Sequence, residues 1–290
     1  MMAQSSSSTS SAQPAVIHRH LTLEVLNYCT HGNVRKARSP PLQELRLSGP
    51  EWKLETLAHL SEVGFEAISS RADMRYINCS GNHLRSLKDI SDTFTYIRIV
   101  DASKNDIEFL CGSAQLNRWP RALKYMVELH LAHNRLMEVP DLSSMPGLKV
   151  LDVSENAITA LNFKQNLIHG KALQRLDLSY NRIEWNSARF ERGVAVFAHL
   201  RRLAALNIDH NPFCDAIAEY ELHILRYVLR NVAKRMANSN FTLNHVSITS
   251  DMWQRARAVR KVVALHRSVI DDSKAASSAD FSSSSSSSSS

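Results

Sequence analysis

The side chains that could bind a metal or attack a substrate are few and poorly spaced for either chemistry. His130 and His133 lie close together in LHLAHN, but no third ligand follows at a spacing typical of a metal site. We therefore expect no metal site. Four cysteines occur without a CxxC pair or a neighbouring histidine at ligand spacing, which favours a reducing compartment: Cys29, Cys79, Cys111 and Cys214.

Common catalytic motifs are also absent from the sequence. It contains no Gly-rich phosphate loop, no nucleophile motif of the Gly-x-Ser-x-Gly type and no paired carboxylates beside an apolar segment. No run approaches the roughly 18 consecutive apolar residues that a membrane-spanning helix needs. We expect no catalytic residue, no bound cofactor and no membrane span.

Positive charge is concentrated near the C-terminus. The formal net charge is +7, and the segment 222–267 holds nine Lys and Arg residues against one acid, Asp251. The overlapping segment WQRARAVRKVVALHRSVI (253–270) alternates Arg with Val and Leu, a pattern that could bind nucleic acid, acidic lipid or the acidic surface of a protein such as tubulin. A terminal helix whose Arg stems cover the core is the competing interpretation. We favour the latter, because only Trp253 could stack on a base.

A repeated apolar pattern organises the rest of the chain. It runs Leu, two residues, Leu, one residue, Leu, two residues, Asn, one residue, Leu, and its copies begin at positions 42, 74, 97, 126, 148, 173 and 203. The first copy has Pro50 in place of Asn. Alternate side chains of a strand point to the same face, so each copy can bury its leucines only by stacking as a parallel strand on its neighbours. The connection 52–65 has apolar spacing that predicts a helix.

This pattern resembles the leucine-rich repeat. The resemblance implies an α/β fold, a right-handed solenoid of about seven coils with a parallel sheet on its concave face and helical caps. The asparagine follows each strand, where its amide can satisfy backbone N–H and C=O groups on both sides of an inward turn. We expect a structural asparagine ladder made of Asn82, Asn105, Asn134, Asn156, Asn181 and Asn211.

Composition and the repeat together predict the domain boundaries. Ser-rich residues 1–19 and 271–290 have little to bury and are expected to be disordered tails. Both ends of a solenoid expose core residues and need caps. We therefore expect a capping helix and linker over 20–41, repeats over 42–213, and a C-terminal cap with a basic helix over 214–270.

The segment after the last repeat resembles the C-terminal cap of one leucine-rich-repeat subfamily. That subfamily includes the phosphatase-1 regulatory subunit, the A-prime protein of the branch-point spliceosomal particle, axonemal dynein light chain and ciliary assembly factors. Leu243-Asn244 departs from its usual Leu-Asp. The resemblance implies protein binding without enzymatic activity. The matching residues are an Asn-Pro, a Tyr and a final turn: Asn211, Pro212, Tyr220, Val246 and Thr249.

Side chains between the buried leucines should project from the concave face of the sheet. From the third copy onward they include five carboxylates against a single Arg, so we expect this face to attract a basic surface or helix. A solvated acidic row that binds nothing is the alternative, but neighbouring apolar and aromatic residues favour binding. The candidate partner-binding residues are Tyr76, Asn78, Ile99, Asp101, Glu128, His130, Val150, Asp152, Arg175, Asp177, Tyr180, Asn207 and Asp209.

These observations predict a non-enzymatic scaffold or adaptor that binds another protein on its concave face. The alternative is a nucleic-acid-associated component that uses the basic C-terminal helix. We expect a monomer outside its complex, located in the cytoplasm, with the cilium or flagellum and the nucleus as the other compartments that remain open.

Overall fold

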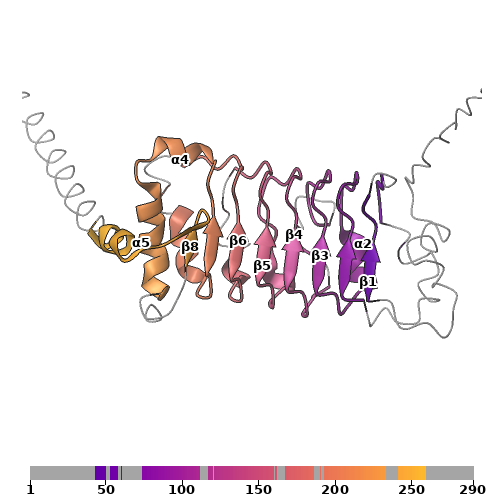
Figure 1. The fold of residues 1–290 in the computed structure, drawn as a ribbon. Coiled ribbons are helices and arrows are strands. Elements are labelled where there is room, and N and C mark those ends of the chain that lie inside the picture. The colour runs from indigo at the N-terminus through magenta and orange to yellow at the C-terminus, as the bar shows by residue number, and fades with distance from the viewer. Residues whose placement is uncertain are drawn as a thin grey trace, which may run out of the picture.

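The structure is a computed structural model in which short strands form one continuous sheet with helices gathered beyond its last strands (Figure 1). The expected tails 1–19 and 271–290, the expected capping helix and linker over 20–41, and the distal part of the basic segment, 259–270, lie outside the residues it describes. The described residues are 43–49, 53–57, 60, 74–111, 117–119, 121–159, 161, 167–185, 190, 193–232 and 241–258.

The sheet is built in chain order because each coil adds one strand beside the preceding one. Neighbouring strands are parallel from the first to the eighth, and only the ninth runs antiparallel to its neighbour. The predicted solenoid with a parallel sheet is confirmed. The strands are β1 (Glu44–Arg46), β2 (Tyr76–Asn78), β3 (Ile99–Asp101), β4 (Glu128–His130), β5 (Val150–Asp152), β6 (Arg175–Asp177), β7 (Ala205–Asn207), β8 (Thr242–Leu243) and β9 (Val246–Ser247).

The leucines of the repeat form the core, as predicted. In the coil of β5, Leu151 and Val153 are both fully buried, and the same two positions are at most 2% exposed in every coil from β2 to β7. The strands pair in register, so that Leu151 lies beside Leu129 on one side and Leu176 on the other. Burying one such side chain stabilises the fold by about 1.5–3 kcal/mol, and stacking repeats that gain along the sheet.

Between strands the chain returns through short helical turns that differ from coil to coil. Each turn buries at least one apolar residue against the strand leucines, such as Ile90 or Phe197. The return path therefore varies in length and form, whereas the strand side keeps a fixed spacing. These elements are α2 (Lys88–Thr93), η4 (Leu142–Ser144), η5 (Leu167–His169) and η6 (Ala195–His199).

The helix predicted over 52–65 is wrong for residues 53–57, whereas Leu60, the other described residue of this segment, lies in a 3-10 turn. Residues 53–57 are not helical, although Leu54 and Leu57 are fully buried. The backbone of Leu54 bonds to the next coil instead, since its N–H donates to Asn82 Oδ1 at 2.8 Å and its carbonyl accepts from His83 N at 2.9 Å. Leu54 and Leu57 thus occupy the places that Leu84 and Leu87 hold in the following coil, and their three-residue spacing belongs to the repeat.

Helices cover the sheet after its last repeat (Figure 1). Asn211 ends the last coil, and the following Pro212 opens α4 (Pro212–Ala216), where a proline costs no hydrogen bond. α5 (Tyr220–Val232) follows and packs against η6. Residues 250–258 are helical after β9, and there Ala256 is fully buried.

Candidate protein-binding face

The side chains of β2–β7 that point away from the core form one surface, which we call the sheet face. They alternate with the buried leucines and are half-buried, apart from the more exposed Arg175. All of the predicted partner-binding residues lie on it except Tyr180 and Asp209, which follow the strand ends. The sheet face consists of Tyr76, Asn78, Ile99, Asp101, Glu128, His130, Val150, Asp152, Arg175, Asp177, Ala205 and Asn207.

A hollow of about 310 Å³ lies on the sheet face between β4 and β8. The predicted residues on β4–β7 line it, whereas those on β2 and β3 lie outside it. The structure therefore brings only the β4–β7 part of the predicted row together around this hollow. The polar lining comes from Glu128, His130, Asp152, Arg175, Asp177, Asn207, Thr242 and His245.

Two residues of this lining, Thr242 and His245, were missed by the sequence analysis. They come from the β8–β9 hairpin, whose two turn residues, Asn244 and His245, have φ values of +49° and +64°. A two-residue turn of this left-handed kind is typical of tight hairpins and favours Asn. The signal in the sequence was the pair Asn244-His245 between two short segments of high β-propensity. In the structure, this hairpin forms the wall of the hollow beyond β7.

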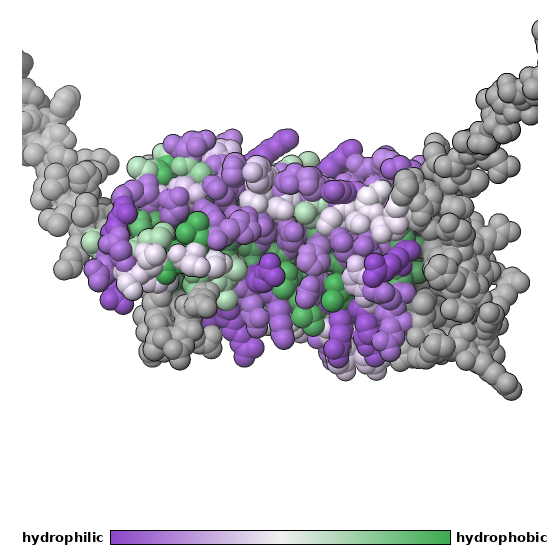
Figure 2. All heavy atoms as spheres, in the orientation of Figure 1, coloured by the Kyte–Doolittle hydropathy of each residue, from purple (hydrophilic) through white to green (hydrophobic). Residues whose placement is uncertain are grey.

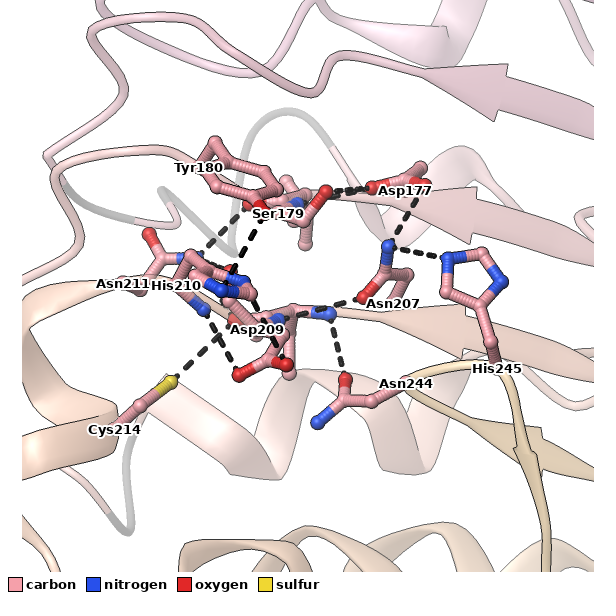
Figure 3. Close-up of polar contacts among 12 residues, drawn as sticks. Asp177, Ser179, Tyr180, Asn207, Asp209, His210, Asn211, Cys214, Asn244 and His245 are labelled. Carbon is pink, nitrogen blue, oxygen red and sulfur yellow. Dashed lines mark hydrogen bonds and ion pairs between the residues drawn. The ribbon is translucent and has the colours of Figure 1, made fainter.

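A polar chain fixes this wall to the sheet (Figure 3). The side-chain amide nitrogen of Asn207 lies 3.0 Å from Asp177 Oδ2 and 2.9 Å from His245 Nε2. Because the amide is a donor, it links a residue of β6 to the turn between β8 and β9. Asp177, Asn207 and His245 therefore form one positioned polar group in the hollow.

The acidic residues of the sheet face also have a local structural role. Asp152 Oδ1 accepts from the N–H of Ser154 at 3.0 Å and from its hydroxyl at 2.7 Å. Asn78 makes the same two bonds to Ser80. The turn needs a side-chain acceptor rather than a negative charge. The charge at Asp152 is therefore available to a partner without being required by the fold.

Charges in the hollow are unequal in sign. The carboxylates of Glu128, Asp152 and Asp177 surround one cation, Arg175, for which the described residues provide no ion pair. His130 Nε2 lies 3.3 Å from Glu128 Oε2. Such a surface complements a partner that brings positive charge and at least one carboxylate for Arg175.

Tyr180 lies at the turn that follows β6, not on the sheet face. Its φ is +53°, and its ring stacks on His210 with 4.1 Å between centroids (Figure 3). The equivalent residue of each coil from β2 to β7 has a positive φ, so these side chains form a row along the rim. A related contact joins His133 Nδ1 to Glu155 Oε2 at 2.7 Å. The row is Gly81, Lys104, His133, Glu155, Tyr180 and His210.

The six asparagines of the ladder are at most 9% exposed and make equivalent hydrogen bonds. Asn156 Oδ1 accepts from the Leu136 N–H of the preceding coil at 2.9 Å. Its amide donates to the carbonyls of Leu131, Val153 and Ser154 at 2.9–3.1 Å. Each amide thus joins two coils through groups that would otherwise be buried without partners.

At the last coil, side chains replace the backbone acceptors that a further coil would supply. The N–H of Ile208 donates to Asn244 Oδ1 at 3.1 Å, whereas the same position in earlier coils donates to the next strand, as Leu178 N does to Asn207 O at 2.7 Å. The N–H of His210 donates to Asp209 Oδ1 at 2.9 Å. Asp209, a predicted partner-binding residue, thus takes part in closing the repeat.

The described thiols are held in their protonated form. Burial raises the pKa of Cys79 to about 12 and that of Cys111 to about 11, and it also raises the pKa of Cys214. A thiol rather than a thiolate is a poor nucleophile and a poor metal ligand. Across the described ranges, no group of three His, Cys, Asp or Glu side chains could hold a metal ion, and no helix is long and apolar enough to cross a bilayer.

A sequence profile of the leucine rich repeat family matches residues 124–183, the coils of β4 to β6. The match, the asparagine ladder and the in-register parallel strands define the chain as a leucine-rich-repeat protein with an α/β solenoid fold. This fold is typically an interaction scaffold without enzymatic activity.

Curated relatives share this repeat region. Human geranylgeranyl transferase type-2 subunit alpha is 31% identical over 129 residues, which cover 44% of this chain and 20% of the subunit. Human Toll-like receptor 2 is 34% identical over 93 residues, which cover 32% of this chain and 10% of the receptor. The chain therefore spans only about a fifth of the length of the transferase subunit and a tenth of the length of the receptor.

Similar solved structures include two of modest likeness. An internalin (InlF) from Listeria monocytogenes is 19% identical, with a TM-score of 0.44, over 59% of this chain and 43% of the internalin. A chain of the LRIM1/APL1C complex is 20% identical, with a TM-score of 0.40, over 91% of this chain and 51% of its own length.

Proposed function

We propose that this chain is a non-enzymatic scaffold that binds a partner protein in the hollow of the sheet face. The observation that supports this most is the hollow itself, because three half-buried carboxylates and one Arg line a concave surface of fixed shape. The partner would bring a basic surface or helix, with a carboxylate to meet Arg175.

The rigidity of the surface supports binding of a folded or helical partner. Asp152 and Asp177 are held by bonds to the serine two residues on, and Asp177 also by Asn207. Side chains that are already ordered lose little entropy on binding.

Charge removal without loss of the turn tests the proposal. In Glu128→Gln with Asp152→Asn, the amide oxygen at 152 can still accept the serine bonds, as Asn78 does, and the amide at 128 can still bond to His130. In affinity purification from the source cells, the wild-type protein should retain partner proteins that the double variant does not retain. The matched control is Glu108→Gln with Glu184→Gln, which removes the same charge from exposed residues outside the sheet face. Equal retention of all partners by both pairs would reject the sheet face as the binding site.

A nucleic-acid-binding helix over 253–270 is the second candidate, and its described part supports a cap instead. Arg255 pairs with Glu219 at 2.8 Å, the Trp253 ring lies 6.3 Å from that of Phe241, and Ala256 is fully buried. We infer that residues 250–258 cover the core. If deletion of 253–270 abolished RNA binding while the protein stayed folded, this second function would be preferred.

We also propose membership of the subfamily that the cap resembles, action as a monomer outside the complex, and a cytoplasmic location. Cys79, Cys111 and Cys214 are free thiols, as a reducing compartment would keep them. Sedimentation of the purified chain tests the monomer, and fluorescence localisation distinguishes cytoplasm, nucleus and cilium or flagellum.

A further inference from the structure

The edge of the sheet where the strands begin carries positive charge in five successive coils. The residues leading into β3 to β7, namely 95–98, 124–127, 146–149, 171–174 and 201–204, include no Asp or Glu. Most of the side chains along the lower edge of the molecule in Figure 2 are hydrophilic. We call its exposed cations the basic edge: Arg98, Lys124, Lys149, Lys171, Arg201 and Arg202.

The basic edge is continuous in space. Backbone bonds join its coils in sequence, since Val127 N donates to Arg98 O, Lys149 N to Val127 O and Gln174 N to Lys149 O, at 2.7–2.8 Å. Strand spacing of about 4.8 Å over the four gaps between these five coils gives a track roughly 19 Å long.

On the opposite rim, where the strands end, charged side chains form ion pairs with one another. There Asp106 pairs with both His83 and Arg135, and His133 pairs with Glu155. Among the described residues, by contrast, Arg98, Lys124, Lys149 and Lys171 have no ion pair to a carboxylate. The basic edge is therefore a one-sign row that lacks internal neutralisation at these four cations.

Two exposed tyrosines lie within this row. Tyr96 and Tyr125 are 41% and 49% exposed, and their rings stack with 5.0 Å between centroids. The guanidinium of Arg75 lies 5.6 Å from the centre of the Tyr96 ring. The next coil has Gly147 at the equivalent position, so no side chain of this column covers the far face of Tyr125.

We propose that the basic edge binds single-stranded nucleic acid, with phosphates along the Lys and Arg row and a base stacked on Tyr125. The phosphates of a nucleic acid complement a row of positive charges. A base can also stack on an exposed aromatic ring beside that row, which the carboxylates of an acidic protein cannot do. A single strand is required because the faces of paired bases are covered by their neighbours. This surface is separate from the sheet face and goes beyond the proposed function.

Fluorescence anisotropy of the full chain with a labelled oligothymidine of about 15 nucleotides tests the proposal. Arg98→Glu with Lys149→Glu should weaken binding at least about tenfold and lower the salt slope by about 1.4, since each lost phosphate contact contributes about 0.7. The matched control, Lys104→Glu with Arg182→Glu on the opposite rim, should stay within about twofold of wild type.

Tyr125 separates nucleic acid from an acidic protein partner. Tyr125→Ala should weaken oligothymidine binding about 5- to 30-fold, while Tyr125→Phe should bind as the wild type does. If oligoglutamate of equal charge bound as tightly and Tyr125→Ala had no effect, an acidic protein partner would replace the proposal.

Absence of oligothymidine binding would overturn it. So would binding that survives the Arg98 and Lys149 reversal and disappears only on deletion of 253–270. If Tyr125→Ala fails to fold, the reversal pair and its salt slope decide the result. Glu128→Gln with Asp152→Asn should leave oligothymidine binding unchanged, so failure of this proposal is distinguishable from failure of the protein-binding one.

Discussion

The side-chain amide of Asn244 donates a hydrogen bond to the hydroxyl of Tyr220 at 2.9 Å. The same hydroxyl donates to Asp209 Oδ1 at 3.1 Å. Burial raises the pKa of the Tyr220 phenol, so it remains a neutral donor and acceptor. The hairpin turn, the first residue of α5 and the end of the last coil are thereby joined through one hydroxyl.

Asn244→Asp should destabilise the protein. The substitution removes the amide donor and places a second carboxylate against a hydroxyl that can donate only once, at a cost of about 1–3 kcal/mol. The free energy of unfolding in urea measures the loss. Asn78→Asp is the matched control, because Asn78 only accepts in its turn and other coils carry Asp there. Equal stability of the two variants would contradict the role given to Asn244.

Asn156→Ala should cost about 1–3 kcal/mol, because one N–H and three carbonyls lose their buried partner. Amide hydrogen exchange should show faster exchange at Leu136, whose N–H loses its acceptor. Asn78→Ala, which loses only the two local bonds to Ser80 at a half-buried site, serves as the control. Unchanged protection of Leu136 would show that another group, such as water, satisfies this amide.

Leu176→Ala should lower the free energy of unfolding by about 2–5 kcal/mol, because it leaves a cavity between the flanking strands. Thermal unfolding followed by circular dichroism measures the change. Val150→Ala removes methyl groups from the half-buried sheet face and should cost clearly less. A larger loss for Val150→Ala than for Leu176→Ala would mean that the two faces of the sheet were assigned the wrong way round.

Stability should fall as the pH rises above about 9. The pKa of Cys79 is raised from 9.0 to about 12 in the folded protein, so unfolding releases a proton between these values. The unfolded state then binds fewer protons than the folded one, and stability decreases by up to about 1.4 kcal/mol per pH unit for this thiol. Below pH 9 both states hold the proton and this contribution is constant.

Cys79→Val provides the control for this pH dependence. Val153 occupies the equivalent buried position in the coil of β5, so valine fits the repeat. The variant should lose part of the decline between pH 9 and 12 in urea titrations. An identical decline in wild type and Cys79→Val would assign the effect to other groups.

The repeat spacing predicted the coils, the buried column and the parallel sheet, because each coil meets nearly the same neighbours. One local error and one departure from the family pattern have physical explanations. Leu54 and Leu57 suggested a helix, but their backbone groups bond to the next coil. The Asn at 244, a departure from the cap pattern, supplies an acceptor and a donor that the last turn uses.

The functional surfaces were less predictable. The acidic row of the sheet face followed from strand alternation, yet its hollow depends on His245 from a hairpin 38 residues beyond its partner Asn207. Tyr180 was expected on the sheet face, but the left-handed turn after β6 directs it to the rim, where it meets His210. Neither outcome can be read from one copy of the repeat.

By itself the sequence determined how each coil folds, since its buried leucines and its asparagine act over a few residues and between adjacent copies. The tertiary structure alone decided which solvent-facing residues become neighbours. Tyr96 and Tyr125 lie far apart along the chain and stack only because their coils pair in register. Register depends on the hydrogen bonds of every strand with the next, and those bonds exist only once the coils have stacked.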